Sequence, residues 1–61
     1  MNRIKELREA KGISMEALAK AANIDGLILY RIEAGKETII STGEAKKIAE
    51  ALGVSVFDIF A

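Results

Sequence analysis

The chain contains no cysteine, no histidine and no proline, and these absences remove whole classes of chemistry. Without cysteine and histidine there is no disulfide, no thiol nucleophile, no imidazole base and none of the usual zinc ligands. Aromatic residues make up only 5% of the chain, so its core must be aliphatic. No apolar run approaches the roughly 20 residues of a membrane-spanning helix, and the first residues lack the apolar stretch of a signal peptide. We therefore expect a cytoplasmic protein with no metal, no cofactor and no membrane partner.

The length and the charge of the chain narrow the function further. Its 61 residues are enough for a single domain that spans residues 1–61. Lysine and arginine total 9, aspartate and glutamate total 9, and the net charge is zero. This balance gives no overall attraction to nucleic acid, although it is compatible with a local basic patch. No pair of carboxylates on an apolar wall and no glycine-rich phosphate loop is evident. We therefore do not expect an enzyme.

Glycines and capping residues divide the sequence into short helices. Apolar spacing and caps place these helices at about residues 2–11, 15–22, 26–34, 42–52 and, as a final turn, 56–60. Ser14, Asp25 and Ser55 are expected N-caps, and Ser41 with Glu44 is expected to form a capping box. No alternation of apolar and polar residues indicates a strand. The predicted fold class is therefore all-α, a compact globule of five helices with short connections.

The apolar stripes of these helices predict the core. In the third helix Leu29 and Ile32 face inward. In the fourth helix four residues do so: Ala45, Ile48, Ala49 and Leu52. Phe60 in the last turn is also expected to be buried.

The helices at 15–22 and 26–34 are joined by a tight turn, which is the sequence outline of a helix-turn-helix. The small side chain of Ala19 allows the two helices to cross closely, and Ile24 fills the space between them. By spacing alone, any pair of short packed helices fits this outline. The outward positions of the helix at 26–34 are Gly26, Leu27, Tyr30 and Arg31.

Four segments, in order, resemble the Cro/C1-type (XRE-like, phage repressor) family of helix-turn-helix domains. They are IKELREAKGIS at residues 4–14, EALA at 16–19, RIEAGK at 31–36 and KIAEALGVS at 47–55. This resemblance covers nearly the whole chain. It implies a transcriptional regulator that binds double-stranded DNA as a homodimer, with the third helix in the major groove and sequence-specific contacts.

The same resemblance implies roles for three residues. Arg8 and Glu33 stand at positions where the family pairs an arginine of the first helix with the glutamate that ends the third. A partly buried structural ion pair between them is therefore expected. Phe57 lies in the C-terminal segment, which often forms a dimer contact in this family, and it is assigned either to that contact or to the core.

The positions that would contact DNA depart from the family pattern. Met15 stands where the family usually has a glutamine that contacts the DNA backbone. The start of the third helix is usually polar, whereas here it consists of Gly26, Leu27 and Ile28. The loop after Gly35 lacks the proline that is often found there. The residues typical of the family's fold are thus retained, whereas those at its DNA-contacting positions are not.

Two functions are compatible with these residues. In the first, Leu27 and Ile28 pack on thymine methyl groups, Gly26 admits the DNA backbone and Arg31 pairs with guanine. Phosphate contacts would come from the helix N-termini at Met15 and Thr42 and from Tyr30, Lys36, Thr38, Ser41 and Thr42. The zero net charge counts against this interpretation, because phosphate contacts supply most of the affinity for DNA.

In the second, the same surface binds another protein or a second copy of the chain. A contiguous exposed apolar patch is predicted from Met15, Leu27, Ile28, Tyr30, Ile39 and Ile40. Conversion of a DNA-binding scaffold into a protein-binding one, by evolution or by engineering, would account for an intact frame with an altered surface. A third interpretation assigns some of these residues to the core, Ile28 first and Ile40 next.

Overall fold

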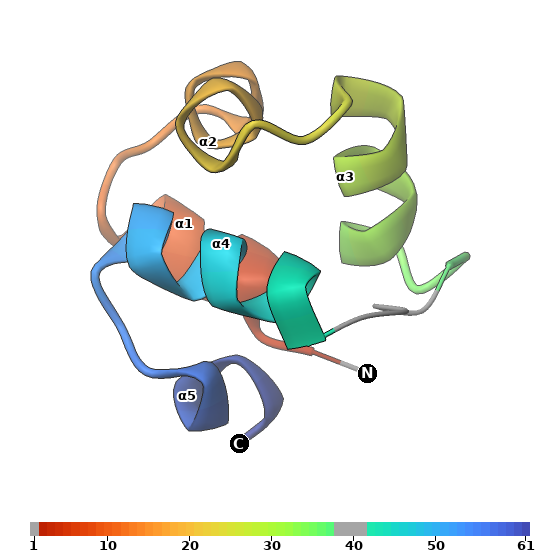
Figure 1. Cartoon of the computed structure of the whole chain (residues 1–61). Coiled ribbons are helices and arrows are strands. Elements are labelled where there is room, and N and C mark those ends of the chain that lie inside the picture. The colour runs from red at the N-terminus through yellow and green to blue at the C-terminus, as the bar shows by residue number, and fades with distance from the viewer. Residues whose placement is uncertain (1, 38–41) are drawn as a thin grey trace.

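Figure 1 shows the computed structural model of the chain, which describes residues 2–37 and 42–61. The described residues form five α-helices and no strand, so the all-α prediction is confirmed. The helices are α1 (Ile4–Ala10), α2 (Met15–Ala22), α3 (Gly26–Glu33), α4 (Thr42–Leu52) and α5 (Val56–Phe60). Within the described ranges, each helix is too short or too polar to traverse a lipid bilayer.

The first helix is shorter than the expected residues 2–11. The side-chain oxygen of Asn2 accepts a hydrogen bond of 3.0 Å from the amide of Ile4, so Asn2 caps the helix from outside. At the other end Lys11 is the C-cap, and Gly12 reverses the chain with a φ of 68°. A β-carbon disfavours that left-handed conformation, which is why a glycine ends this helix. α2 and α4 have the expected bounds.

The core lies between α4 and the helix-turn-helix. α4 packs against α2 and α5, and α2 packs against α3. In Figure 1 α2 and α3 lie at the top, and α5 lies at the bottom near the C-terminus. The main buried cluster consists of Ile4, Leu18, Ala19, Ala22, Leu29, Ile32, Ile48, Ala49, Leu52 and Ile59. Every member is aliphatic, as the low aromatic content predicts, and the expected stripes of α3 and α4 are confirmed.

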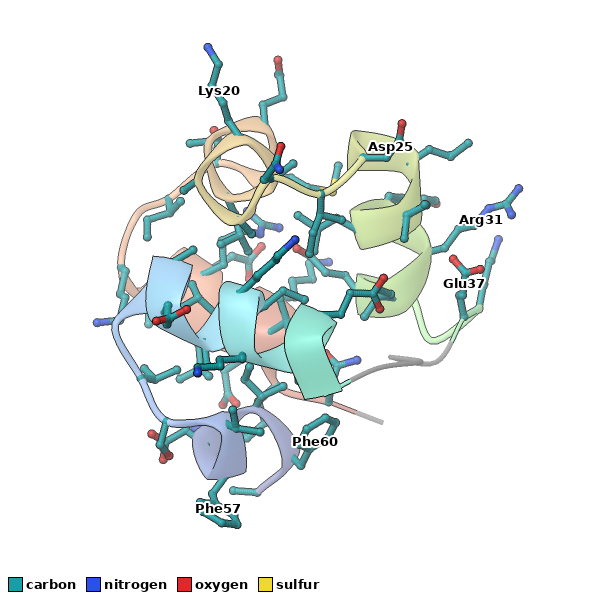
Figure 2. The ribbon with its side chains drawn as sticks, in the orientation of Figure 1. Lys20, Asp25, Arg31, Glu37, Phe57 and Phe60 are labelled. Carbon is teal, nitrogen blue, oxygen red and sulfur yellow. The ribbon has the colours of Figure 1, made fainter. Side chains whose placement is uncertain are left out.

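The last helix corrects one expectation. Phe60 was expected in the core, but 52% of it is exposed, and the neighbouring Phe57 is 85% exposed. α5 instead buries Ile59 completely and Val56 in part. Val56 and Ile59 lie three apart and pack inward on one face of the helix, whereas Phe57 and Phe60, also three apart, are exposed. Figure 2 shows both phenylalanine rings on the outside of the molecule, so the prediction for Phe60 is wrong.

A reciprocal capping box begins α5. The amide of Asp58 donates to the hydroxyl of Ser55 at 3.3 Å, and the amide of Ser55 donates to a carboxylate oxygen of Asp58 at 3.0 Å. The hydroxyl of Ser55 also donates to that oxygen, at 3.0 Å. The backbone hydrogen bond from Ser55 is the main cause that lowers the pKa of Asp58 below its ordinary value. The expected cap of α5 by Ser55 and Asp58 is therefore confirmed, and the box favours the charged carboxylate.

Two hydrogen bonds tie the segment before α1 to distant parts of the chain. The side-chain nitrogen of Asn2 donates to the carbonyl of Ile32 at 3.1 Å, near the end of α3. The amide of Arg3 donates to the carbonyl of Ile59 at 2.7 Å, inside α5. The ends of α3 and α5 are thus connected through two consecutive residues.

Candidate functional site

α2 and α3 form a tight helix-turn-helix. α2 begins after Ser14, whose hydroxyl accepts a hydrogen bond of 3.1 Å from the amide of Ala17. It ends at Asn23, which adopts a left-handed conformation with a φ of 55°. The amide of Ile24 then donates to the carbonyl of Ala19 at 2.9 Å and closes the turn. Ala19 is buried, as expected for the small residue at the helix crossing.

Asp25 fixes the start of α3. Its carboxylate accepts hydrogen bonds from the amides of Leu27 at 2.9 Å and Ile28 at 3.4 Å. The predicted N-cap is therefore confirmed. The carboxylate also occupies the amides that an anion would otherwise bind. The first turn of α3 is consequently poorly suited to hold a phosphate group.

The outer face of α3 consists of Gly26, Leu27, Ile28, Tyr30 and Arg31. Leu27 is 60% exposed and Tyr30 is 47% exposed, in agreement with the predicted outward positions. Ile28 is 39% exposed, so its assignment to the core is wrong. Three consecutive side chains of this face, at 26–28, lack any hydrogen-bonding group. The face is therefore apolar in its first turn and gains polar groups only at Tyr30 and Arg31.

Within the described chain, neither the backbone conformation at Gly26 nor close packing around it requires a glycine. Three other glycines, Gly12, Gly35 and Gly53, have a positive φ, whereas Gly26 does not. An added β-carbon at Gly26 would meet no described atom within 4 Å. The space beside the backbone at this position therefore faces outward and is open to a partner.

An open hollow lies between α1, the start of α2 and α3. It is lined by Lys5, Arg8, Met15, Tyr30, Glu33 and Ala34. Met15 and Tyr30 thus line the same hollow, and Met15 also packs in part against the core. Of the predicted apolar patch, Met15, Leu27, Ile28 and Tyr30 are described, and they lie on or next to the outer face of α3.

Arg8 and Glu33 form the expected structural ion pair. Nε of Arg8 donates to Oε2 of Glu33, and Nη2 donates to Oε1, each at 3.0 Å. Nη1 donates to the carbonyl of Ile13, also at 3.0 Å, so three sides of the guanidinium are used. The side chains are only 12% and 5% exposed. The hydrogen bonds to Glu33 raise the pKa of Arg8.

The loop after α3 is described as far as residue 37. α3 ends at Glu33, one residue earlier than expected, and Gly35 turns the chain with a φ of 75°. The amides of Lys36 and Glu37 donate to the carbonyl of Arg31 at 2.9 and 3.2 Å. Four predicted site residues of this loop lie outside the described residues: Thr38, Ile39, Ile40 and Ser41. The side chain of Thr42 also lies outside the described part of the structure. Their contacts, and the capping box of Ser41, stay predictions.

Sequence reasoning missed two features of the surface. Lys5 lines the same hollow as Tyr30, and no role is predicted for it from the sequence. Phe60 is exposed on α5 as well as Phe57, for which an exposed dimer contact was one of the two expectations. The spacing of three residues between them was the available signal, because it places both rings on one face of a helix.

Comparisons with known proteins agree with this geometry. The model of the family described as "Helix-turn-helix" matches residues 4–59. The solved structure of a SinR protein/SinI protein complex contains a chain that is similar to this one, with 37% sequence identity and a TM-score of 0.82. The match covers 88% of this chain and 52% of that chain, so the protein spans about half the length of its structural relative. No curated protein matches this chain.

Proposed function

The chain belongs to the Cro/C1-type helix-turn-helix family of regulatory DNA-binding domains, and from this premise we propose that it binds double-stranded DNA sequence-specifically. The outer face of α3 is the proposed contact surface, and it enters the major groove. One observation carries the proposal: α3 is the second helix of a tight helix-turn-helix and its outer face is uncovered. The Arg8–Glu33 pair holds the end of this helix against α1, which fixes the angle at which α3 is presented.

Phosphate contacts are proposed at the start of α2. Within the described chain, Ser14 accepts only the amide of Ala17 there, which leaves the amides of Met15 and Glu16 directed out of the helix. Free amides at a helix N-terminus, together with the helix dipole, favour a phosphate oxygen. Tyr30 lines the same hollow as Met15, and its hydroxyl is a second proposed phosphate contact.

The charged residues around α3 predict a modest affinity for DNA. Arg31 and Lys36 are exposed at the end of α3, and Arg31 forms no ion pair within the described residues. Asp25 caps the start of the same helix, Glu37 lies in the loop that follows it, and the net charge of the chain is zero. Since phosphate contacts dominate affinity, we expect binding that is weak at physiological salt and much stronger at low salt.

The test is a titration of a labelled random-sequence duplex pool with the protein, followed by fluorescence anisotropy at several salt concentrations. We expect saturable binding at low salt that weakens steeply as salt is added. Absence of binding at tens of micromolar protein in low salt would contradict the proposal, because nonspecific DNA binding normally falls within roughly 1–100 μM.

Two variants locate the contact surface. Arg31→Ala removes one exposed cation from α3 and is expected to weaken binding and to reduce the salt dependence by about one counterion. Lys11→Ala removes the same charge at the end of α1, outside α2 and α3, and serves as the matched control. Equal effects of the two variants would show that only the total charge matters, and would count against α3 as the contact surface.

A second candidate function is protein binding through the same surface. The exposure of Leu27, Ile28 and Tyr30 favours it, because such an apolar patch usually marks a protein interface. The structural relative was solved as a complex of two proteins, SinR and SinI. The partner is either another chain or a second copy that forms a homodimer.

Leu27→Asp tests this second candidate by analytical ultracentrifugation. Leu27 is largely exposed, so the variant should fold with an unchanged Tm. Association that is lost in the variant would support the protein interface. Association that persists unchanged would exclude Leu27 from it.

Binding without catalysis is part of the proposal. The family and the fold are those of regulatory DNA-binding domains and not of enzymes. The hollow beside Tyr30 is open, and the ionisable pair that lines it, Arg8 and Glu33, is engaged in structural hydrogen bonds. A DNA-binding regulator acts where the DNA is, and we propose the cytoplasm as its location.

A further inference from the structure

The first turn of α3 presents an unusual surface for a helix that faces DNA. Leu27 is 60% exposed and Ile28 is 39% exposed, and neither side chain donates or accepts a hydrogen bond. Gly26 precedes them and leaves open space beside the backbone. The N-terminal residues of such a helix are the ones that meet base edges in the major groove. The base contacts of this helix are therefore mainly apolar.

We propose that Leu27 and Ile28 select thymine through its C5-methyl group, so that the bound site is rich in A·T pairs. This inference rests on the proposed DNA binding and adds the base preference. The thymine methyl is the apolar group that a standard base pair presents in the major groove. Packing an exposed leucine on it buries two apolar groups together.

A G·C pair at the same place is less favourable because it lacks the methyl group. Its major-groove edge carries the N7 and O6 acceptors of guanine and the N4 donor of cytosine. Leu27 would displace water from these polar atoms and offer no hydrogen bond in return. An A·T pair also presents polar atoms, at N7 and N6 of adenine and O4 of thymine, so the discrimination comes from the methyl group alone.

Arg31 adds one polar contact at a defined distance from the apolar turn. It lies one helical turn after Leu27, which corresponds to about 6 Å along the axis. Base pairs are spaced about 3.4 Å apart, so the two side chains reach positions roughly two base-pair steps apart when the axis of α3 runs along the groove. The guanidinium is exposed and has no ion-pair partner among the described residues, and guanine is its usual major-groove target. The expected half-site is a short run of A·T pairs with one G·C pair about two steps from the contacted thymine.

The experiment compares thymine with uracil, which differ only by the methyl group. A bound site is first selected from a random duplex pool, and anisotropy titrations then use that site with each thymine replaced in turn by deoxyuridine. We expect the affinity to fall about three- to fourfold for each contacted methyl group. Deoxyuridine outside the selected site should have no effect. Leu27→Ala, which leaves the core intact, should reduce the difference between thymine and uracil.

The outcomes separate this inference from the function on which it rests. A thymine preference that shrinks in Leu27→Ala supports the inference. Salt-dependent binding with equal affinity for thymine and uracil overturns the inference and leaves DNA binding standing. A thymine preference unchanged in both Leu27→Ala and Ile28→Ala overturns the assignment to these residues. Absence of salt-dependent binding overturns both proposals and favours a protein as the partner of the apolar turn.

Discussion

Arg8 and Glu33 are joined by two parallel hydrogen bonds of 3.0 Å, one from Nε and one from Nη2, across 25 positions of sequence. This bidentate contact links α1 to the last residue of α3. Nη1 of the same guanidinium donates to the carbonyl of Ile13, just before α2. One side chain therefore connects the three helices that position the outer face of α3.

Glu33→Ala tests the contribution of this pair to stability. The substitution leaves a largely buried guanidinium without its carboxylate, and we expect the free energy of unfolding to fall by about 3 kcal/mol. For a domain of this size, that loss corresponds to a decrease in Tm on the order of 15 °C. The measurement is thermal unfolding followed by circular dichroism.

The matched control is Glu6→Ala, which removes the exposed ion pair between Arg3 and Glu6 with its distance of 2.6 Å. This pair is well solvated, so little change in Tm is expected. Similar decreases in the two variants would argue that burial does not distinguish the two ion pairs.

The orientation of α5 predicts that two of its apolar residues contribute very differently to the free energy of unfolding. Phe57→Ala removes a ring that is 85% exposed and should change the free energy of unfolding by less than about 0.5 kcal/mol. Ile59→Ala removes a completely buried side chain and should cost about 2–5 kcal/mol. Chemical denaturation of both variants at one protein concentration measures the difference. A large loss in Phe57→Ala would mean that a partner or a second copy covers this ring.

Two glycines predict changes of opposite sign. Gly12 has a φ of 68°, so Gly12→Ala should destabilise the domain by about 1 kcal/mol. Gly26 begins α3 with open space beside it, so Gly26→Ala should stabilise the domain by about 0.5 kcal/mol. Urea unfolding of both variants provides the comparison. We expect a partner to approach the backbone through the open space beside Gly26, so Gly26→Ala should weaken partner binding while it raises stability. Equal binding by the variant and the parent would show that no partner uses this space.

The capping box of α5 predicts a dependence of stability on pH. The hydrogen bonds from Ser55 lower the pKa of Asp58 in the folded protein below the ordinary value of 3.8. A lowered folded pKa stabilises the fold above the unfolded pKa, and the gain is lost as the pH falls through the folded value. Asp58→Asn should therefore be less stable than the parent at neutral pH, and the gap should narrow below about pH 4. Urea midpoints between about pH 7 and pH 2 follow this gap; a gap that stays constant would exclude the charge of Asp58 as its cause.

Most of the helix-turn-helix could be predicted because its signals are local. Ser14 and Asp25 cap helices within three residues of themselves, and Asn23 needs only its own left-handed conformation to end α2. The burial of Leu29 and Ile32 follows from helical spacing. The Arg8–Glu33 contact, by contrast, required the resemblance to a known family, since nothing in local spacing relates two residues so far apart.

The errors occur where a local pattern is too short to have a clear period. α5 has five residues, and either Phe60 or Val56 is compatible with burial beside Ile59 when the neighbouring helices are unknown. In the structure α5 packs against α4, with Val56 partly buried and Phe60 exposed. The start of α1 was misplaced for a related reason, because Asn2 is used as a cap and as a donor to α3 instead of as a helical residue.

The 2.7 Å hydrogen bond from the amide of Arg3 to the carbonyl of Ile59 makes one exchangeable proton a reporter for the docking of the last helix. That amide precedes α1, so its protection from solvent exchange comes from α5 and not from a helix of its own. Its exchange rate should follow the local opening of α5, and the amides of the α4 core should follow global unfolding. The difference between the two protection factors would measure how much of the cooperativity of this small domain reaches its final turn.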